Sequence, residues 1–169
     1  MKNKQKPIGD VILKDTISGQ RRSREWFATR LYSELNKVQD KVPDLGSVCG
    51  VSPNNLYFFN YNAKYAKKLP YWDTRPLVYV LELLGNGFYG YNLHYLNPVF
   101  RKVVAKSLKA NNSRAFAPEE CFHQYLCAGL LTSPLKVPED SWESVAFLST
   151  ENFIDKNGQP VPSSKVWSI

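Results

Sequence analysis

Residues 77–95 decide the fold of this chain and read LVYVLELLGNGFYGYNLHY. Residues 77–84 are a short apolar run with valine and tyrosine, a composition that favours a strand buried inside a sheet. Residues 85–87, Gly-Asn-Gly, tolerate the positive φ of a tight turn, and residues 88–95 return as an aromatic segment. The stretch therefore predicts an antiparallel β-hairpin.

Helical patterns lie on both sides of this hairpin. Residues 24–40 carry apolar side chains at helical spacing behind Ser23, which is a favourable N-cap residue. Asn97 as N-cap and Pro98 at the first helical position open a second predicted helix. Residues 118–131, which begin with proline and two glutamates, predict a third helix.

The remaining sequence adds shorter strands and irregular segments. The run at residues 56–61, LYFFNY, is β-prone, and residues 144–148 fit a short strand. We therefore expect an α+β fold in which a small, aromatic-rich antiparallel β-sheet, or a partly open barrel, packs against two or three helices. Residues 1–20 predict a flexible basic arm, and residues 21–169 predict a single α+β domain.

Positive charge is concentrated in the first two thirds of the chain. The net charge is +7, and residues 1–116 hold 19 of the 22 Lys and Arg residues. Residues 117–169 hold three basic and seven acidic residues. Two interpretations fit this asymmetry: contact with a polyanion or an acidic partner surface, or a surface that only keeps the protein in solution.

Two sets of side chains are candidates for such a contact. The basic candidates are Arg21, Arg22, Arg24, Lys64, Lys67, Lys68, Arg101, Lys102, Lys106 and Lys109. The last four fall on or beside one basic face of the second predicted helix. The aromatic candidates are Tyr71, Trp72, Tyr89 and Tyr91, because aromatic rings flanked by cations grip single-stranded nucleic acid. The alternative is that these rings form the core of the sheet.

Metal and cofactor chemistry has weak support in the sequence. Cys49, Cys121 and Cys127 are odd in number and irregular in spacing, which fits reduced thiols better than a disulfide framework. Cys121, His123 and Cys127 form a metal-like grouping, but no second Cys/His pair completes four ligands. The glycines of residues 85–90 match a dinucleotide fingerprint in spacing only, because they join two β segments. We expect neither a metal nor a cofactor.

Catalysis would require residues that are distant in the sequence to meet. A hydrolase is the alternative if Asp73, Glu82 and His94 line one pocket, with the histidine as a base. The sequence lacks a G-x-S-x-G nucleophile motif. We therefore expect no enzymatic activity, with Glu82 facing solvent and His94 in a structural role.

Three motifs resemble a family of small proteins of contractile-tailed bacteriophages. They are residues 56–61 (LYFFNY), 69–78 (LPYWDTRPLV) and 87–96 (GFYGYNLHYL), and the similarity extends over residues 20–165. The resemblance implies a phage context, and hence a part of the virion, an assembly factor or a DNA-handling protein. It brings no catalytic residues with it.

The leading hypothesis is a phage virion structural or assembly protein that contacts other phage proteins, or packaged DNA, through its basic surface. The alternative is a non-virion nucleic-acid-binding protein that acts in replication, packaging or host takeover. No apolar run approaches the length of a membrane span, since residues 77–84 are the longest and include Glu82. We expect no membrane partner, and a location in the virion or the host cytoplasm.

Overall fold

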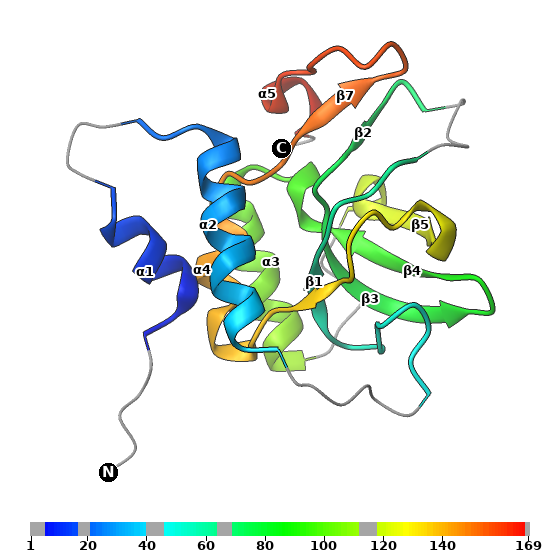
Figure 1. Ribbon diagram of the computed structural model, residues 1–169, viewed down its shortest axis with the longest axis horizontal. Coiled ribbons are helices and arrows are strands. Elements are labelled where there is room, and N and C mark those ends of the chain that lie inside the picture. The colour runs from blue at the N-terminus through cyan, green and yellow to red at the C-terminus, as the bar shows by residue number, and fades with distance from the viewer. Residues whose placement is uncertain (1–5, 17–20, 40–45, 64–68, 112–117, 168–169) are drawn as a thin grey trace.

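The computed structural model of the chain describes residues 6–16, 21–39, 46–63, 69–111 and 118–167. These residues form the expected α+β fold, with helices on one side of an antiparallel sheet (Figure 1). The sheet has the order β5-β4-β3-β1-β6, with β1 Leu56–Phe58, β3 Leu77–Leu84, β4 Gly87–Asn92, β5 Phe122–Leu126 and β6 Leu135–Lys136. Strands β2 (Tyr71–Asp73) and β7 (Phe153–Asp155) pair separately. The helices are α1 Ile8–Lys14, α2 Arg24–Lys37, α3 Pro98–Asn111, α4 Trp142–Phe147 and α5 Ser163–Val166. The large sheet is open and does not close into a barrel, because β5 and β6 form its two edges.

The predicted hairpin is confirmed as β3 and β4. Val78 lies opposite Asn92 and Leu84 lies opposite Gly87, with a register shift between Val80 and Glu82. The turn does not use the positive φ expected of its glycines. Gly87 is needed for another reason: a Cβ at this position would overlap the backbone of the neighbouring strand β5.

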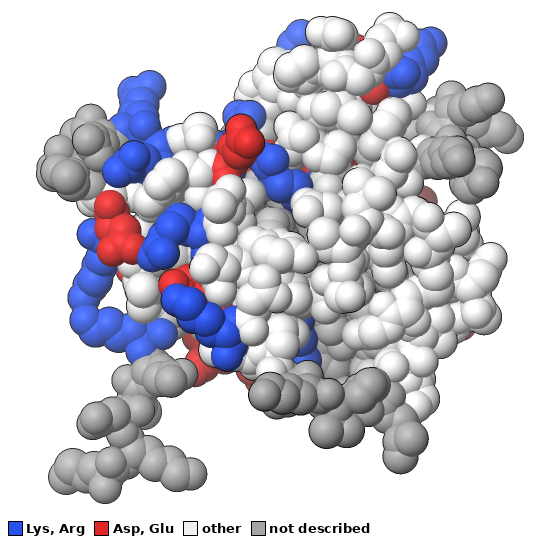
Figure 2. All heavy atoms as spheres, in the orientation of Figure 1, with Lys and Arg blue, Asp and Glu red and all other residues white. Residues whose placement is uncertain are grey.

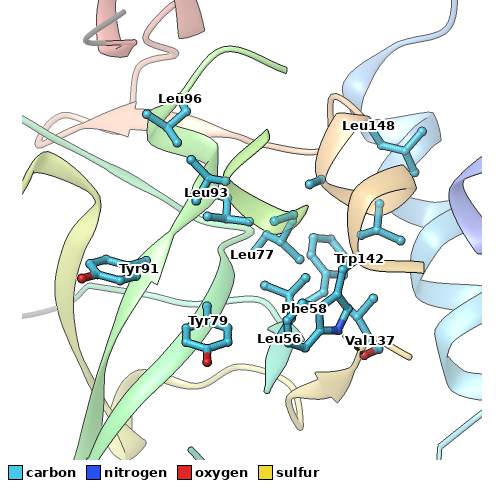
Figure 3. Packing of buried hydrophobic residues seen from close by; sticks show 14 of the residues in the cluster. Leu56, Phe58, Leu77, Tyr79, Tyr91, Leu93, Leu96, Val137, Trp142 and Leu148 are labelled. Atoms are coloured by element: carbon cyan, nitrogen blue, oxygen red, sulfur yellow. Dashed lines mark hydrogen bonds between the residues drawn. The ribbon is translucent and has the colours of Figure 1, made fainter. Parts of the chain in front are cut away.

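The two faces of the sheet bury different sets of side chains, as the period of two in a strand requires. Leu77 and Phe58 point toward the helices, where Trp142 of α4 enters the same core (Figure 3). The indole of Trp142 donates a hydrogen bond to the carbonyl of Val137 at 3.0 Å. The opposite face carries a second cluster, rich in aromatic rings, to which Phe59 and Phe88 belong. Both faces of β1 and of the first half of β3 are therefore covered.

The predicted helices at residues 24–40 and after Asn97 are confirmed as α2 and α3. The Ser23 side chain accepts a hydrogen bond from the amide of Trp26 at 3.1 Å, and Asn97 Oδ1 accepts from Phe100 at 2.9 Å. These side chains are the N-caps that the sequence predicts. None of the helices in the described residues is long and apolar enough to cross a membrane.

The flexible arm predicted for residues 1–20 is wrong for residues 8–14, which form α1. Ile12 of this helix is fully buried, and α1 contacts both α2 and α4. The amides of Ile8 and Gly9 donate hydrogen bonds to the hydroxyls of Ser141 (3.0 Å) and Ser144 (3.1 Å). These serines satisfy amide groups that the first turn of a helix leaves free. Contacts with α4 therefore stabilise this helix, and α4 lies more than 130 residues further along the chain.

Two further predictions in the last third of the chain are wrong. The helix predicted at residues 118–131 is replaced by β5, because residues 122–126 pair along the edge of β4. The strand predicted at residues 144–148 is replaced by α4, whose Trp142, Val145 and Ala146 recur at helical spacing and are buried. In both segments tertiary contacts decide between helix and strand.

The expectation of three reduced thiols is also wrong. Cys49 and Cys127 form a disulfide, with their Cα atoms 5.5 Å apart, across 78 residues of sequence. Cys121 is a buried free thiol, and burial raises its pKa to about 12. The odd count of cysteines therefore reflects one bridge and one core residue.

Candidate functional site

The polar residues of the two central motifs meet in a buried network around Asp73. Its Oδ1 accepts hydrogen bonds from the backbone amides of Arg75 and Asn152, both at 3.0 Å. Its Oδ2 accepts from Asn92 Nδ2 at 3.1 Å and lies 2.7 Å from His94 Nδ1. Burial alone would raise the pKa of Asp73, but attraction to His94 and the hydrogen bonds outweigh burial and lower it to about 2. The network thus holds a charged carboxylate inside the protein.

The same network extends to a hydroxyl group, so that an acid, a histidine and a hydroxyl follow one another as in a nucleophilic triad. His94 Nε2 lies 3.1 Å from Thr150 Oγ1, so Asp73, His94 and Thr150 form a continuous chain. His94 and Thr150 are both 0% exposed, and no substrate reaches this hydroxyl in the observed arrangement. Glu82 stays exposed on β3 opposite Tyr89, as expected, and does not join the group. The three residues required for the hydrolase alternative are therefore not brought together.

Arg101 and Glu151 form a second buried charged group. Arg101 Nη1 lies 3.2 Å from Glu151 Oε2, and Arg101 Nε donates to the carbonyl of Leu96 at 2.7 Å. Burial would raise the pKa of Glu151, but the charge of Arg101 outweighs burial and lowers it. The prediction that Arg101 contacts a partner at the surface is wrong, because its side chain is 0% exposed and turned toward the core.

The other basic candidates differ in whether an acidic side chain pairs with them. Arg24 Nε lies 3.5 Å from Glu151 Oε1, and Lys109 Nζ lies 3.1 Å from Glu143 Oε1, so both already have an acidic partner. Lys64, Lys67 and Lys68 lie outside the described residues. Four candidates are exposed and pair with no acidic side chain in the described part of the chain: Arg21, Arg22, Lys102 and Lys106.

Two of these four cations rest on aromatic rings. The guanidinium of Arg22 lies 4.8 Å from the ring centre of Trp26, and Lys102 Nζ lies 5.9 Å from that of Phe147. Such contacts hold a cation near the surface without neutralising it. Figure 2 shows Lys and Arg gathered over the helices, with Asp and Glu among them, whereas the surface over the sheet is largely uncharged in this view.

The aromatic candidates occupy different environments. Tyr91 is buried in the core cluster on the helical side of the sheet, so its predicted role at a recognition surface is wrong. Tyr89 is half-buried and stacks on the exposed ring of Phe122, with ring centres 5.2 Å apart. Tyr71 is half-buried, and Trp72 lines a pocket.

This pocket opens between β2, β5 and the chain after β1, and has a volume of about 280 Å³. Rings from Tyr61, Trp72, Tyr95, His123 and Tyr125 line it. The rings of Tyr95 and His123 stack with centres 4.4 Å apart, and those of Tyr61 and Tyr125 meet edge to face at 5.0 Å. Four of these five rings, all except Trp72, are therefore held by contacts with one another.

The metal-like grouping of Cys121, His123 and Cys127, which the sequence supports only weakly, does not assemble. Cys127 is bonded to Cys49, and His123 Nε2 donates to the carbonyl of Glu120 at 2.8 Å. Within the described residues, no three His, Cys, Asp or Glu side chains lie close enough to hold a metal ion.

Several residues of these sites escape prediction from the sequence. For Asn92 the sequence does contain a signal, because a polar side chain within a buried aromatic strand requires a hydrogen-bond partner. Thr150 and Glu151 carry no comparable signal, because nothing in residues 149–152 marks a return to Asp73 and Arg101. Tyr125 is hidden because the sequence of its segment predicts a helix.

Comparison with known proteins identifies a family. The family model described as phage T4 terminal DNA protecting protein matches residues 2–117. No curated protein and no solved structure matches the chain. The matched segment holds 19 of the 22 Lys and Arg residues and ends where the chain changes from basic to acidic. The expected phage context is thereby confirmed at the level of the family. Because the match covers more than half of its 169 residues, the chain belongs to the phage T4 terminal DNA protecting protein family.

Proposed function

We propose that this protein binds the ends of phage DNA and shields them from exonucleases. The observation that carries the proposal is the family match, since the family is described as terminal DNA protecting and the matched residues hold most of the positive charge. Cations that replace the counterions of DNA phosphates supply most of the affinity of such binding.

The exposed, unneutralised cations are the proposed phosphate contacts. Arg21 and Arg22 precede α2, while Lys102 and Lys106 lie one turn apart on α3. A guanidinium can bind a phosphate through two hydrogen bonds, and lysine binds it as a point charge. Lys64, Lys67 and Lys68 stay in the proposal on the basis of the sequence alone.

Protection of a DNA end requires occupancy and no chemistry. A protein that covers the terminal phosphates denies an exonuclease its substrate for as long as the complex lasts. The buried chain of Asp73, His94 and Thr150 then serves as a scaffold. A free end exists in the packaged genome and after its entry into a cell, so we propose the virion and the host cytoplasm as the places of action.

A second candidate function, attachment to another phage protein during assembly, has its own observation. On α3 the side chains of Val99 and Val103 are 68% and 53% exposed, beside Lys102 and Lys106. Exposed apolar side chains next to cations suit a protein partner with an acidic rim. Salt separates the two functions, because an apolar contact persists at salt concentrations that release phosphate contacts.

The test measures binding and protection with linear duplex DNA. We expect the protein to slow digestion by an exonuclease that starts at duplex ends, and to bind linear DNA more tightly than covalently closed circular DNA. Charge reversal of Arg21, Arg22, Lys102 and Lys106 together should lower the slope of log affinity against log salt by about 3 to 4.

The matched control reverses Lys156 and Lys165, which are exposed cations outside the family match. This control should bind and protect like the parent protein. The proposal fails if closed circles compete as well as linear DNA, or if the parent protein does not slow digestion.

A further inference from the structure

The ring-lined pocket has the chemistry of a site for a flat, uncharged ligand. Its volume of about 280 Å³ lies just below the range of about 300 to 1,000 Å³ that is usual for drug-sized ligands. Five of the thirteen described residues that line it carry aromatic rings, and Trp72 supplies the largest ring. Rings that are fixed before binding stack on a ligand without losing further side-chain entropy.

The charges around the pocket exclude a phosphate from its interior. None of the described residues that line it is Lys or Arg. One acidic residue, Asp73, lines it, and both of its carboxylate oxygens already accept hydrogen bonds. Burial lowers the pKa of His123 in spite of its hydrogen bond to Glu120, so this ring is neutral at pH 7. A polyanion would therefore leave its charged backbone outside.

Polar groups at the pocket can nevertheless recognise a ligand edge. Because His123 Nε2 donates to the carbonyl of Glu120, its Nδ1 is left as an acceptor. The indole Nε1 of Trp72 is buried and donates to no described residue. Two exposed polar residues, Asn62 and Gln124, are also among the residues that line the pocket. Aromatic faces combined with such an edge are the features that bind an unpaired nucleobase.

We infer that this pocket receives the unpaired terminal base of the bound DNA, stacked among Trp72, Tyr95 and His123. The inference rests on the proposed binding to DNA ends and adds the part of the DNA that is recognised. A base inside a duplex must lose two stacking partners and its pair before it enters a pocket, whereas an overhanging base loses at most one stacking partner. The pocket would therefore make binding selective for ends, which cations alone do not do.

The test compares three duplexes that differ only at one end: blunt, with a one-nucleotide overhang, and with an abasic overhang of the same length. Stacking of one base contributes about 1–3 kcal/mol, so the base-bearing overhang should bind about 5- to 150-fold more tightly than the abasic one. A 2-aminopurine in the overhang should also lose fluorescence on binding, because it stacks on the rings.

The pocket variants are Trp72→Leu and His123→Leu, each of which replaces a ring of the proposed stack with an aliphatic side chain. Phe122→Ala is the matched control, since Phe122 is an exposed ring on the same strand but does not line the pocket. Both pocket variants should lose most of the preference for the base, and the control should keep it. Thermal unfolding checks that each variant is folded, and His123→Leu remains the test if Trp72→Leu does not fold.

The outcomes separate this inference from the proposed function. Equal affinity for base-bearing and abasic overhangs, with ends still preferred over closed circles, overturns the pocket and leaves the binding of DNA ends intact. A base preference that survives in folded pocket variants overturns the pocket as well. Absence of binding to any DNA end overturns the proposed function first.

Discussion

Asp73 and His94 lie 2.7 Å apart inside the protein, although each comes from a different one of the motifs that resemble phage proteins. The aspartate is the residue before the β2–β3 connection, and the histidine follows β4. Asn92 joins them, because it donates to Asp73 and accepts from the amide of His94 at 3.0 Å. Its Oδ1 also accepts from the amide of Leu77 at 3.3 Å. The polar residues of these motifs therefore hold strands together, and the motifs mark a scaffold.

The first prediction concerns the charge of Asp73. Asp73→Asn should lower the free energy of unfolding by about 3 kcal/mol, because it removes a buried carboxylate that is hydrogen-bonded to His94, Asn92 and two backbone amides. Urea denaturation measures the change. Glu82→Gln is the control, since Glu82 is exposed on β3 and its replacement should alter stability by less than about 0.5 kcal/mol. Similar effects of the two substitutions would contradict the role assigned to the network.

The second prediction is a pH dependence with the same origin. The pKa of Asp73 is lowered from its ordinary 3.8 to about 2 in the folded protein, so the unfolded chain binds a proton first as pH falls. Its contribution to stability is complete above about pH 4 and is lost between about pH 4 and 2, amounting to about 2 kcal/mol. Denaturation curves at several pH values should show this loss in the parent protein. Asp73→Asn should lack this component, and parallel pH curves would disprove the assignment.

The local elements of the fold could be predicted from the sequence. The hairpin and α2 carry their signals within a few residues: apolar runs of strand length, turn residues, and the cap at Ser23. α3 is equally local, because Asn97 and Pro98 fix its start. The same helical spacing places the cations Lys102 and Lys106 together.

Elements that depend on distant partners could not be predicted. α1 has one short apolar patch around Ile12, and its partners Ser141 and Ser144 lie at the start of α4 and within it. β5 becomes a strand because β4 offers it an edge, and Arg101 turns inward because Glu151 lies on the inner side of α3. The local sequence of α1, of β5 and around Arg101 does not reveal these distant partners. Only the tertiary structure shows whether each segment is a helix or a strand and whether Arg101 is buried.

The third prediction distinguishes Arg101 from its neighbour Lys102. Arg101→Met should lower the free energy of unfolding by about 3 kcal/mol, because the buried carboxylate of Glu151 then keeps only the more exposed Arg24 as a cationic partner. Lys102→Met should leave stability nearly unchanged and reduce the salt dependence of DNA binding by about one phosphate contact. Denaturation and binding titrations on both variants measure the two effects. The opposite result, with the salt dependence reduced by Arg101→Met in a folded protein, would contradict the burial of Arg101.

The fourth prediction concerns the disulfide between Cys49 and Cys127. Closing a loop across 78 residues restricts the unfolded chain, and loss of such a bridge typically costs about 2–4 kcal/mol. Reduction should therefore lower the melting temperature of the parent protein. The Cys49→Ala/Cys127→Ala variant should start from the lower value and show no further change on reduction. A melting temperature that is insensitive to reductant in the parent would show that the bridge does not stabilise the fold.

The fifth prediction tests whether α1 is part of the folded body. Gly9→Ala places a methyl group where the backbone of Ser144 lies, and should lower the free energy of unfolding by about 1–3 kcal/mol. Gly85→Ala is the matched control: a methyl group added at Gly85 would meet no atom of a described residue within 4 Å, and Gly85 has no positive φ, so this change should be nearly neutral. Alanine otherwise favours a helix over glycine by about 1 kcal/mol, so an undocked α1 would gain helicity from Gly9→Ala without losing stability. Destabilisation by Gly9→Ala alone therefore requires α1 to be docked on α4, and a neutral result would return residues 8–14 to the flexible arm expected from the sequence.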